Sequence, residues 1–394
     1  MAGSETGAVR VRGTLLGENT PNDIVVRGGR IASIAPAGKQ RPDAGSSKTI
    51  IAPTLFDIQI NGCGGHDLQR PDVTPATVAR VSDELAKAGV SHWIPTFITA
   101  SLRDLEHGCR VIAETLRDRA MARRIPGVHI EGPYISPEDG PRGAHAKRHV
   151  RKPDLREFDR LYKAADGKVA YITTAPELPG AIPFIKEVAS RGVVVSLGHH
   201  NATPDQIRRA VDAGARLCTH LGNGLAAQIN RHHNPLWPQL ADDRLACSLI
   251  PDLEHLPADV LKIFTRVKGP QACIFTSDAV HLAGMKPGRY QLGEMPVELK
   301  RSGRICLVGT ELLAGSAIGL LQGIVNAAHV TDFSLKHAFA SATTVPAKLF
   351  RLPYRFPPPA VGAPASFIAF DIVPARNRPR AVPQAVFIDG KRYA

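Results

Sequence analysis

The middle of the chain alternates short apolar segments, typical of buried strands, with longer segments of helical periodicity. Start and stop signals bound several of the predicted helices. One helix begins after Thr74-Pro75 and ends before Gly89. Another begins with the capping box Thr203-Pro204-Asp205-Gln206 and ends before Gly214. The eight strand candidates are TLFDIQI, HWIPTFI, GVHIE, VAYITTA, VVVSLGH, RLCTH, LACSLI and CIFTSD. Eight is the number that a closed barrel needs, so we predict an α/β fold, a (β/α)₈ TIM-like barrel, over residues 53–356. A doubly wound open sheet is the alternative, but no GxGxxG follows the early strands.

Both ends of the chain alternate apolar and polar residues, as half-buried antiparallel strands do. Examples are VRVRGTLL, DIVVRGG and RIASIAP at the start, and ASFIAFDIV and QAVFIDGKRY at the end. The proline-rich Phe356–Pro359 separates the final strands from the middle, and Asp389-Gly390 is a turn signal. We therefore predict a small β-sandwich domain built from both termini, residues 1–52 and 357–394.

Composition limits the class of protein. The 394 residues are 43% hydrophobic and 22% charged, which excludes a disordered or fibrous chain. The six cysteines are scattered without a CxxC pair, which favours reduced core thiols over disulfides or a Cys-based zinc site. No apolar run approaches the roughly 18 residues of a membrane span, and the N-terminus has no apolar secretory region. We expect a cytoplasmic protein without a membrane partner.

The charge is clearly positive. Lys and Arg number 49 against 36 Asp and Glu, a formal net charge of +13. Such an excess raises the question of nucleic-acid binding, but the basic residues are dispersed, with modest clusters at Arg148–Lys152 and Arg376–Arg380. No nucleic-acid-binding module is recognisable, so we expect no nucleic-acid partner. Net charge itself speaks to solubility and steering rather than to the reaction.

Polar residues follow several predicted strands, where TIM barrels carry their active sites. Glu131 ends the third strand, His199 the fifth and His220 the sixth. Two histidines and one glutamate form an established catalytic zinc set that leaves a position for water. The alternative interpretation is that each is a satisfied hydrogen-bonding group or a helix cap. Gln59 and Asn61, at the end of the first strand, share one face.

Two further residues have a place in such chemistry. Asp278 ends the eighth strand and could move a proton between water and a leaving amine; the alternative is a helix cap. His145 follows a basic glycine-containing loop and could donate a hydrogen bond to a developing oxyanion; a solvated loop is the alternative. We interpret three other ligand-capable histidines as supporting or surface groups: His200, His232 and His233.

These segments together resemble the N-acetylglucosamine-6-phosphate deacetylases of the amidohydrolase superfamily over nearly the whole chain. The resemblance rests on IAPTLFDIQINGCGG, VHIEGPYISPEDGPRGAHAK, TTAPE, LGHHNAT, THLGNG, TSDA, LLAGSA and SATTVPAKLF, in that order. It implies hydrolysis of the acetamide of an amino-sugar phosphate in amino-sugar catabolism. It also implies that Glu131, His199 and His220 hold one divalent metal ion, Zn²⁺ being the first expectation. Asp278 is then the catalytic acid and base, and His145 polarises the carbonyl.

The resemblance also implies the contacts to substrate. Arg231 matches the arginine that binds the phosphate, and His255 matches a further histidine that contacts the substrate. In this family the arginine and that histidine typically reach the substrate across a homodimer interface, so the resemblance implies a homodimer. The full set of implied substrate-binding residues is Ala144, His145, Asn223, Gly224, Arg231, His255, Leu313, Ala314 and Gly315.

Some positions depart from the family pattern. Gln59 and Asn61 stand where two-metal members carry His-x-His, which points to a one-metal site. THLGNGL lacks the usual aromatic at Gly222 and the usual alanine and methionine at Gly224 and Leu225, and His200 replaces a serine. These changes surround the substrate, so another N-acyl substrate stays open: N-acetylgalactosamine-6-phosphate, an unphosphorylated N-acetylhexosamine or an N-acyl amino acid. A catalytically inactive barrel scaffold is disfavoured, because every residue that carries chemistry is present.

Overall fold

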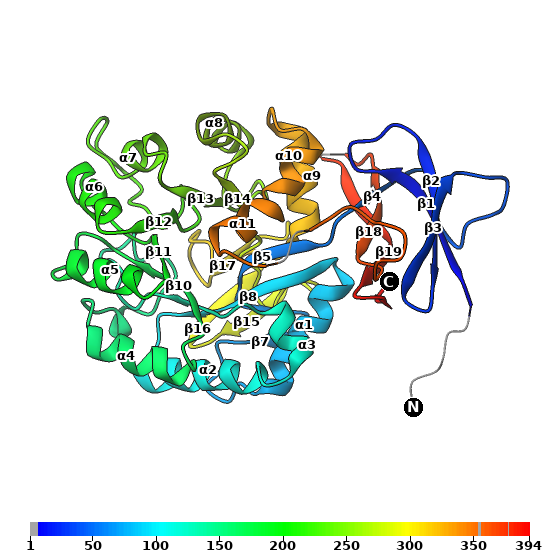
Figure 1. Ribbon diagram of the computed structural model, residues 1–394. Coiled ribbons are helices and arrows are strands. Elements are labelled where there is room, and N and C mark those ends of the chain that lie inside the picture. The colour runs from blue at the N-terminus through cyan, green and yellow to red at the C-terminus, as the bar shows by residue number, and fades with distance from the viewer. Residues whose placement is uncertain (1–6, 354–355, 377) are drawn as a thin grey trace.

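Eight parallel strands form the body of the protein in a computed structural model, which describes residues 7–353, 356–376 and 378–394 (Figure 1). Their order in the sheet is β5-β8-β9-β10-β11-β12-β13-β14, so each strand lies beside the next along the chain. The eight strands expected from the sequence are these eight, and the barrel prediction is confirmed. Their bounds are β5 Leu55–Ile60, β8 Val90–Ile98, β9 Val128–Glu131, β10 Val169–Thr174, β11 Val194–Leu197, β12 Ala215–Cys218, β13 Ala246–Leu249 and β14 Cys273–Phe275.

Helices surround the barrel (Figure 1). Thr74 and Thr203 are the N-caps of the two helices predicted to begin at these residues. Thr203 and Gln206 form the two reciprocal hydrogen bonds of a capping box. Gly89 and Gly214 follow the ends of these helices at φ +87° and +120°, a backbone conformation that favours glycine. The helices are α1 Pro75–Lys87, α2 Leu102–Thr115, α3 Arg119–Arg124, α4 Leu155–Ala164, α5 Ala181–Ser190, α6 Pro204–Asp212, α7 Leu236–Ala241, α8 Ala258–Lys268, α9 Leu320–Val330, α10 Leu335–Ala340, α11 Thr344–Leu349 and the 3₁₀ turn Lys147–His149.

The barrel closes between β5 and β14 by an irregular seam. Backbone pairing there is limited to the bridge between Ile60 and Ala279 in the described chain. The carbonyl oxygens of Ser341 and Ala342 accept from Phe275 N–H on β14 and Phe56 N–H on β5, both at 2.8 Å. The buried carboxylate of Asp57 adds side-chain bonds across the junction: it accepts from the Thr276 hydroxyl at 2.6 Å and from the Ser277 N–H at 3.1 Å. One side chain therefore ties the first strand to the segment that carries Asp278.

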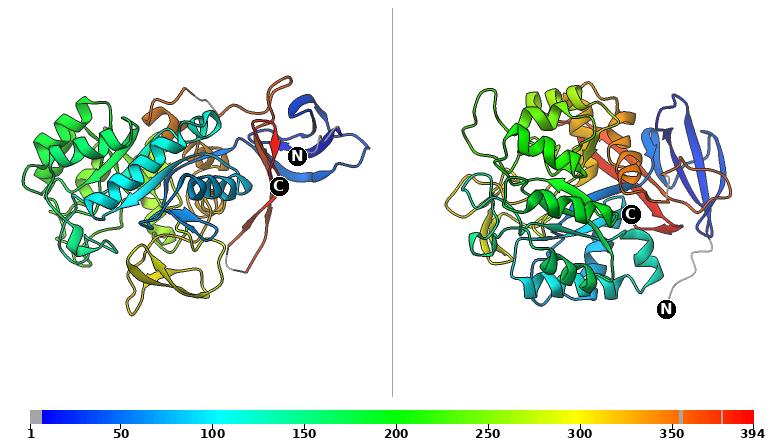
Figure 2. Two further views of the ribbon diagram at one scale, coloured as in Figure 1. Left: turned by 90° about the horizontal axis from the view of Figure 1, so that it is seen from below. Right: turned by 60° about the vertical axis from the view of Figure 1, so that its left-hand side comes forward.

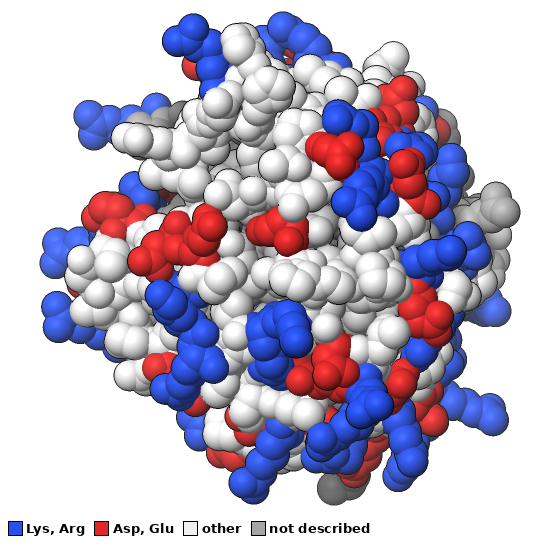
Figure 3. Space-filling model, turned by 90° about the vertical axis from the view of Figure 1, so that its left-hand side faces the viewer, with Lys and Arg blue, Asp and Glu red and all other residues white. Residues whose placement is uncertain are grey.

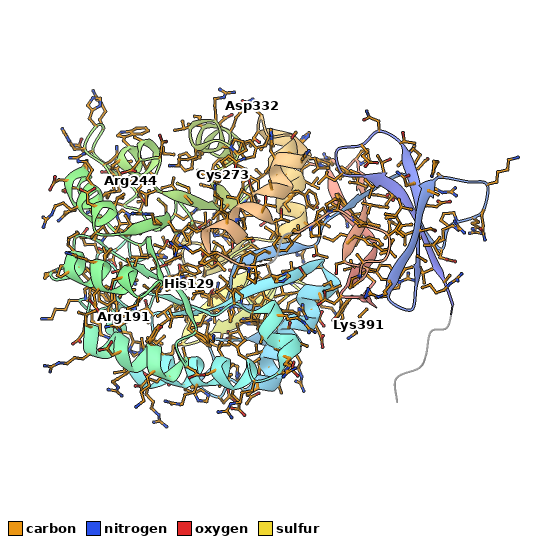
Figure 4. All side chains as sticks on the ribbon, viewed as in Figure 1. His129, Arg191, Arg244, Cys273, Asp332 and Lys391 are labelled. Carbon is orange, nitrogen blue, oxygen red and sulfur yellow. The ribbon has the colours of Figure 1, made fainter. Side chains whose placement is uncertain are left out.

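A polar layer fills the barrel beneath its carboxyl end. His129, labelled in Figure 4, lies on β9 inside the barrel, and its ring bonds Thr96 at 3.1 Å and Thr173 at 2.8 Å. It stacks on Tyr171, with ring centroids 3.6 Å apart. Because side chains alternate along a strand, His129 and Glu131 point to the same side, one layer apart. The layer holds the strands in register below the polar strand ends.

Strands from both termini form a separate seven-stranded sheet, as predicted, and the blue and red strands lie side by side in Figure 1. Its order is β20-β19-β18-β4-β1-β2-β3. The Arg30–Pro364 bridge links β3 to the segment before β18, so the sheet encloses a core of its own that includes Phe367 and Phe387. Ile368 faces the barrel, against Gly89. The bounds are β1 Val9–Leu15, β2 Pro21–Arg27, β3 Arg30–Pro36, β4 Ala44–Ala52, β18 Phe367–Val373, β19 Arg380–Ile388 and β20 Lys391–Arg392.

The sequence interpretation missed a three-stranded antiparallel sheet inserted between β14 and α9. Figure 2 shows this yellow sheet projecting from the barrel at one side. Its strands are only three to five residues long, so the alternation along them is a weak signal in the sequence. The missed elements are β15 Gly288–Leu292, β16 Met295–Leu299 and β17 Ile305–Leu307, together with the two-residue strands β6 Gly62–Cys63 and β7 His66–Asp67.

The surface carries charges of both signs rather than one basic stripe on the face in Figure 3, where Lys and Arg lie among Asp and Glu. Arg244, labelled in Figure 4, pairs with Asp212 and Asp242 at 2.8 and 2.6 Å. All six cysteines are unpaired. Among the described residues, no helix combines the length and apolar character that crossing a bilayer requires.

The seam predicts a specific stability defect. Asp57→Ala leaves the buried Ser277 N–H and Thr276 hydroxyl without their acceptor, and each such group costs about 1–3 kcal/mol. We expect the free energy of unfolding to fall by about 3 kcal/mol, measured by urea denaturation. Asp243→Ala, which removes an exposed carboxylate, is the control and should change stability by less than about 0.5 kcal/mol. Equal midpoints for the two variants would contradict the role of Asp57.

Candidate active site

Three acceptor groups from different strands meet at the carboxyl end of the barrel. Glu131 is the last residue of β9, and His199 and His220 follow β11 and β12 by two residues. The Nε2 atoms of His199 and His220 lie 3.2 and 2.9 Å from Glu131 Oε1, and 3.1 Å from each other. All three ligand atoms lie within 4.8 Å of one another, and all three residues are buried. The structure thus brings together the three residues that the sequence selected.

The hydrogen bonds of His199 show which of its two ring nitrogens carries the proton. Its Nδ1–H donates to the carbonyl oxygen of Pro141 at 3.0 Å, so its Nε2 presents a lone pair to His220 and Glu131. A buried carboxylate and imidazole lone pairs that face each other fit a shared cation. The donor set, two nitrogens and a carboxylate oxygen, suits a divalent ion such as Zn²⁺.

Backbone strain accompanies these positions. His199, His220 and Asp278 have φ of +54°, +29° and +50°, in the left-handed region that non-glycine residues rarely adopt. Each such residue costs about 1–3 kcal/mol and persists only where the surrounding structure imposes it. The three lie directly beyond three barrel strands, so the strain coincides with the point where each side chain turns into the cavity.

The backbones of two glycines lie close to the ring of His199. A Cβ on Gly224 would lie 2.7 Å from Nδ1 of His199, and one on Gly143 would lie 3.3 Å from Cε1. Both glycines have positive φ, +60° and +57°. The imidazole is therefore held between two backbones and fixed by its bond to Pro141. Gly224 is one of the departures from the family pattern noted in the sequence. The ring of His199 occupies the space that a side-chain methyl at position 224 would need.

Asp278 lies opposite the first strand, whose amides hold it. Asn61 Nδ2 and Gln59 Nε2 donate to its Oδ1 at 2.7 and 3.0 Å, and the same Gln59 amide donates to Glu131 at 3.1 Å. Burial, together with the negative charge of Glu131, raises the pKa of Asp278 to about 7. A carboxyl group with a pKa near neutrality is suited to taking up and releasing a proton.

His145 reaches the same site from the loop beyond β9. Its Nε2 lies 3.1 Å from Nε2 of His199. Its Nδ1 lies 2.8 Å from the hydroxyl oxygen of Thr99 and 3.4 Å from the Thr99 backbone nitrogen, so Thr99 holds the ring with Nε2 facing the site. Burial lowers the pKa of His145 well below its ordinary value, so the ring is neutral. Thr99 follows β8, a strand end that the sequence interpretation did not consider.

A cavity of about 400 Å³ opens above these groups. His255 lines it, with its Nδ1 2.7 Å from Asp252 Oδ2. Burial would lower the pKa of His255, but Asp252 raises it above its ordinary value. Besides His255, the lining includes the sequence-selected Ala144, His145, Asn223, Gly224, Leu313, Ala314 and Gly315.

Arg231 is the sequence-selected residue that the structure places elsewhere. It is exposed and is not among the residues that line the cavity. Its carbonyl oxygen accepts from the indole N–H of the exposed Trp237 at 3.0 Å. Gly222 explains the absent aromatic: a Cβ there would meet Leu256 at 2.8 Å and Phe264 at 2.9 Å. His232 and His233 are exposed and His200 is buried.

Comparison with known proteins decides the family. A sequence model of the amidohydrolase family matches residues 50–393. The chain belongs to the amidohydrolase family. Among its relatives, N-acetylglucosamine-6-phosphate deacetylase of Homo sapiens is 32% identical over 369 residues, which cover 89% of this chain and 87% of the human one. This amidohydrolase is also similar to N-acetylgalactosamine-6-phosphate deacetylase of Escherichia coli O157:H7, 28% identical over 93% of this chain and 95% of that one.

A solved structure has the same fold over nearly the full length. It is a mutant N-acetyl-D-glucosamine-6-phosphate deacetylase of Mycobacterium smegmatis in complex with N-acetyl-D-glucosamine-6-phosphate. It is 27% identical, with a TM-score of 0.83, and the alignment covers 98% of this chain and 99% of that one. The recognition of the deacetylase family in the sequence is confirmed, and this amidohydrolase is an amide hydrolase by its family.

The contact between Gly224 and His199 gives a testable consequence. Gly224→Ala places a methyl against Nδ1 and displaces the ring, so we expect affinity for Zn²⁺ to fall about 10- to 100-fold, as when other groups that orient ligands are lost. Titration of the metal-free protein with Zn²⁺ measures it. Gly319→Ala is the control, because a Cβ there meets nothing within 4 Å. Unchanged affinity in Gly224→Ala would show that the glycine does not position the ligand.

Proposed function

We propose that this amidohydrolase hydrolyses the acetamide of N-acetylglucosamine-6-phosphate to glucosamine-6-phosphate and acetate, a reaction of amino-sugar catabolism. The observation that carries the proposal is that Glu131, His199, His220, Asp278 and His145 face one cavity. The names of the human and Mycobacterium smegmatis relatives support the same substrate. We expect the reaction to take place in the cytoplasm.

Glu131, His199 and His220 would hold one divalent ion, with Zn²⁺ as the first expectation. When bound, such an ion supplies Lewis-acid chemistry that activates water and polarises a carbonyl. The amides of Gln59 and Asn61 support a single ion. Both donate N–H groups to carboxylates here, where histidines would offer lone pairs to a second metal.

Asp278 and His145 have different roles in the hydrolysis of the amide. Asp278 takes a proton from the attacking water and later gives it to the departing nitrogen, which leaves as an amine. The Nε2–H of His145 donates to the carbonyl oxygen as negative charge develops on it, an interaction worth about 2.7–4 kcal/mol in comparable sites. Gln59 and Asn61 hold Asp278 at 3.0 and 2.7 Å, so the carboxylate keeps one position through both proton transfers.

A second substrate has support in the comparisons. The Escherichia coli relative is named for N-acetylgalactosamine-6-phosphate, which differs in the orientation of one hydroxyl group. The loops that would contact the sugar differ from the family pattern at Gly222 and Leu225. Acetate release from both phosphorylated epimers and from the unphosphorylated sugars distinguishes the candidates.

We also propose a homodimer in which Arg231 contacts the phosphate in the partner's cavity. Arg231 is exposed outside the cavity of its own chain, and Trp237 beside it is 50% exposed. On α8, Ile263 and Val267 are 52 and 55% exposed and four residues apart, so they share one helix face. Such apolar residues beside a basic loop suit a contact between two copies.

Two variants separate metal binding from proton transfer. We expect Glu131→Gln to lose bound metal and acetate release together, because a ligand charge is removed. Asp278→Asn should keep its metal while kcat falls about 10²- to 10⁴-fold. Metal analysis and an acetate-release assay measure both. The absence of acetate release by the folded, metal-replete wild type would overturn the proposed function.

Arg231 tests the phosphate and the dimer together. Arg231→Ala should raise KM for phosphorylated sugars and leave KM for unphosphorylated sugars unaffected, because only the phosphorylated sugars carry the anion. If the arginine acts across the interface, mixing Arg231→Ala with Asp278→Asn should restore activity in mixed dimers. Equal losses on both kinds of sugar would contradict a phosphate contact, and a lack of recovery would place Arg231 in its own subunit's site.

A further inference from the structure

The inserted sheet brings one basic side chain to the cavity. Arg304 directly precedes β17, and it is the single Lys or Arg among the described residues that line the cavity. The lining also includes the carboxylates of Glu131, Asp278 and Glu311. A phosphorylated sugar brings a further negative charge into this cavity, and a cation from the same chain is the group best placed to offset it.

The guanidinium of Arg304 has donors to offer. Its two nearby carboxylates, on Glu254 and Glu311, lie 3.7 and 3.6 Å away, beyond hydrogen-bond distance. Its Nε–H is buried without a partner in the described structure. Glu311 is 74% exposed and already takes a hydrogen bond from Lys300 at 2.8 Å. Neither carboxylate therefore satisfies Arg304, unlike the bidentate pairs elsewhere, such as Arg160 with Glu106 at 2.6 and 3.1 Å.

Its place in the fold joins two substrate elements. Ile305, the next residue, accepts from Ala314 N–H at 3.0 Å, which puts Arg304 beside the loop Leu313-Ala314-Gly315. On its other side, Glu254 is the neighbour of His255 in the chain. Arg304 thus lies between the loop expected at the sugar and the neighbour of His255, the further histidine expected to contact the substrate.

We infer that Arg304 is a specificity-determining residue that binds the phosphate of the substrate from within the same chain. A guanidinium presents paired N–H donors that match phosphate oxygens, and such charge-assisted bonds are about twice as strong as neutral ones. The inference rests on the proposed function for the identity of the substrate. It adds to Arg231 a phosphate contact that does not depend on a second subunit.

Steady-state kinetics on the metal-replete full chain test the inference. Arg304→Ala should lower kcat/KM for N-acetylglucosamine-6-phosphate about 10- to 100-fold, mainly through KM, the range for losing a bond between charged groups. Activity on unphosphorylated N-acetylglucosamine should fall much less than activity on the phosphorylated sugar, and Arg304→Lys should recover part of the loss. Arg301→Ala is the matched control: it removes the same charge from an exposed position on the same turn, outside the cavity.

A binding measurement separates this inference from the proposed function. Calorimetry with inorganic phosphate reports the anion site even if the wild type fails to cleave the phosphorylated sugar. Weaker phosphate binding in Arg304→Ala than in Arg301→Ala supports the site in either case. Equal phosphate affinities, or equal losses of kcat/KM on phosphorylated and plain sugars, would overturn it and leave Arg304 a purely structural residue.

Discussion

Three acceptor atoms that face one another inside a buried barrel mouth are the constraint on which the rest of the structure depends. Glu131 Oε1 and the Nε2 atoms of His199 and His220 lie about 3 Å apart, and all three residues are buried. Buried acceptors at this spacing oppose one another unless a cation is shared among them. The bond from His199 to Pro141 fixes the ring in the tautomer that keeps a lone pair inward.

The barrel makes that arrangement possible by imposing geometry that a loop would not hold. His199, His220 and Asp278 adopt left-handed backbone conformations just beyond their strands. The strands are in turn fixed by their ladder, by the polar layer around His129, and by Asp57 at the seam. Local strain at the site is thus supported by the regular structure beneath it, as expected when strain is stored at functional positions.

The sequence allowed the barrel and the groups at its strand ends to be predicted because both follow from local pattern. Buried parallel strands appear as short apolar runs, and the residue that ends each run is visible without any tertiary information. Arg304, Thr99 and Asp252 were missed for a different reason. Arg304 reaches the cavity from the small inserted sheet, and Asp252 matters only through the ring of His255 that it contacts. The place of Arg304 is a tertiary relation that no spacing in the chain encodes, whereas Asp252 lies only three residues before His255 and its pairing was overlooked.

Chemistry and specificity are consequently carried by different parts of the fold. The groups suited to splitting an amide are held at the ends of β9, β11, β12 and β14, where a shift of one residue would turn each side chain out of the cavity. The groups expected to contact the sugar and its phosphate lie on loops and on the inserted sheet, which tolerate change. Relatives named for the glucosamine and the galactosamine phosphates accord with this division. The departures at Gly222 and Leu225 lie in the same class of segment, among the residues expected to surround the sugar and away from Glu131, His199 and His220.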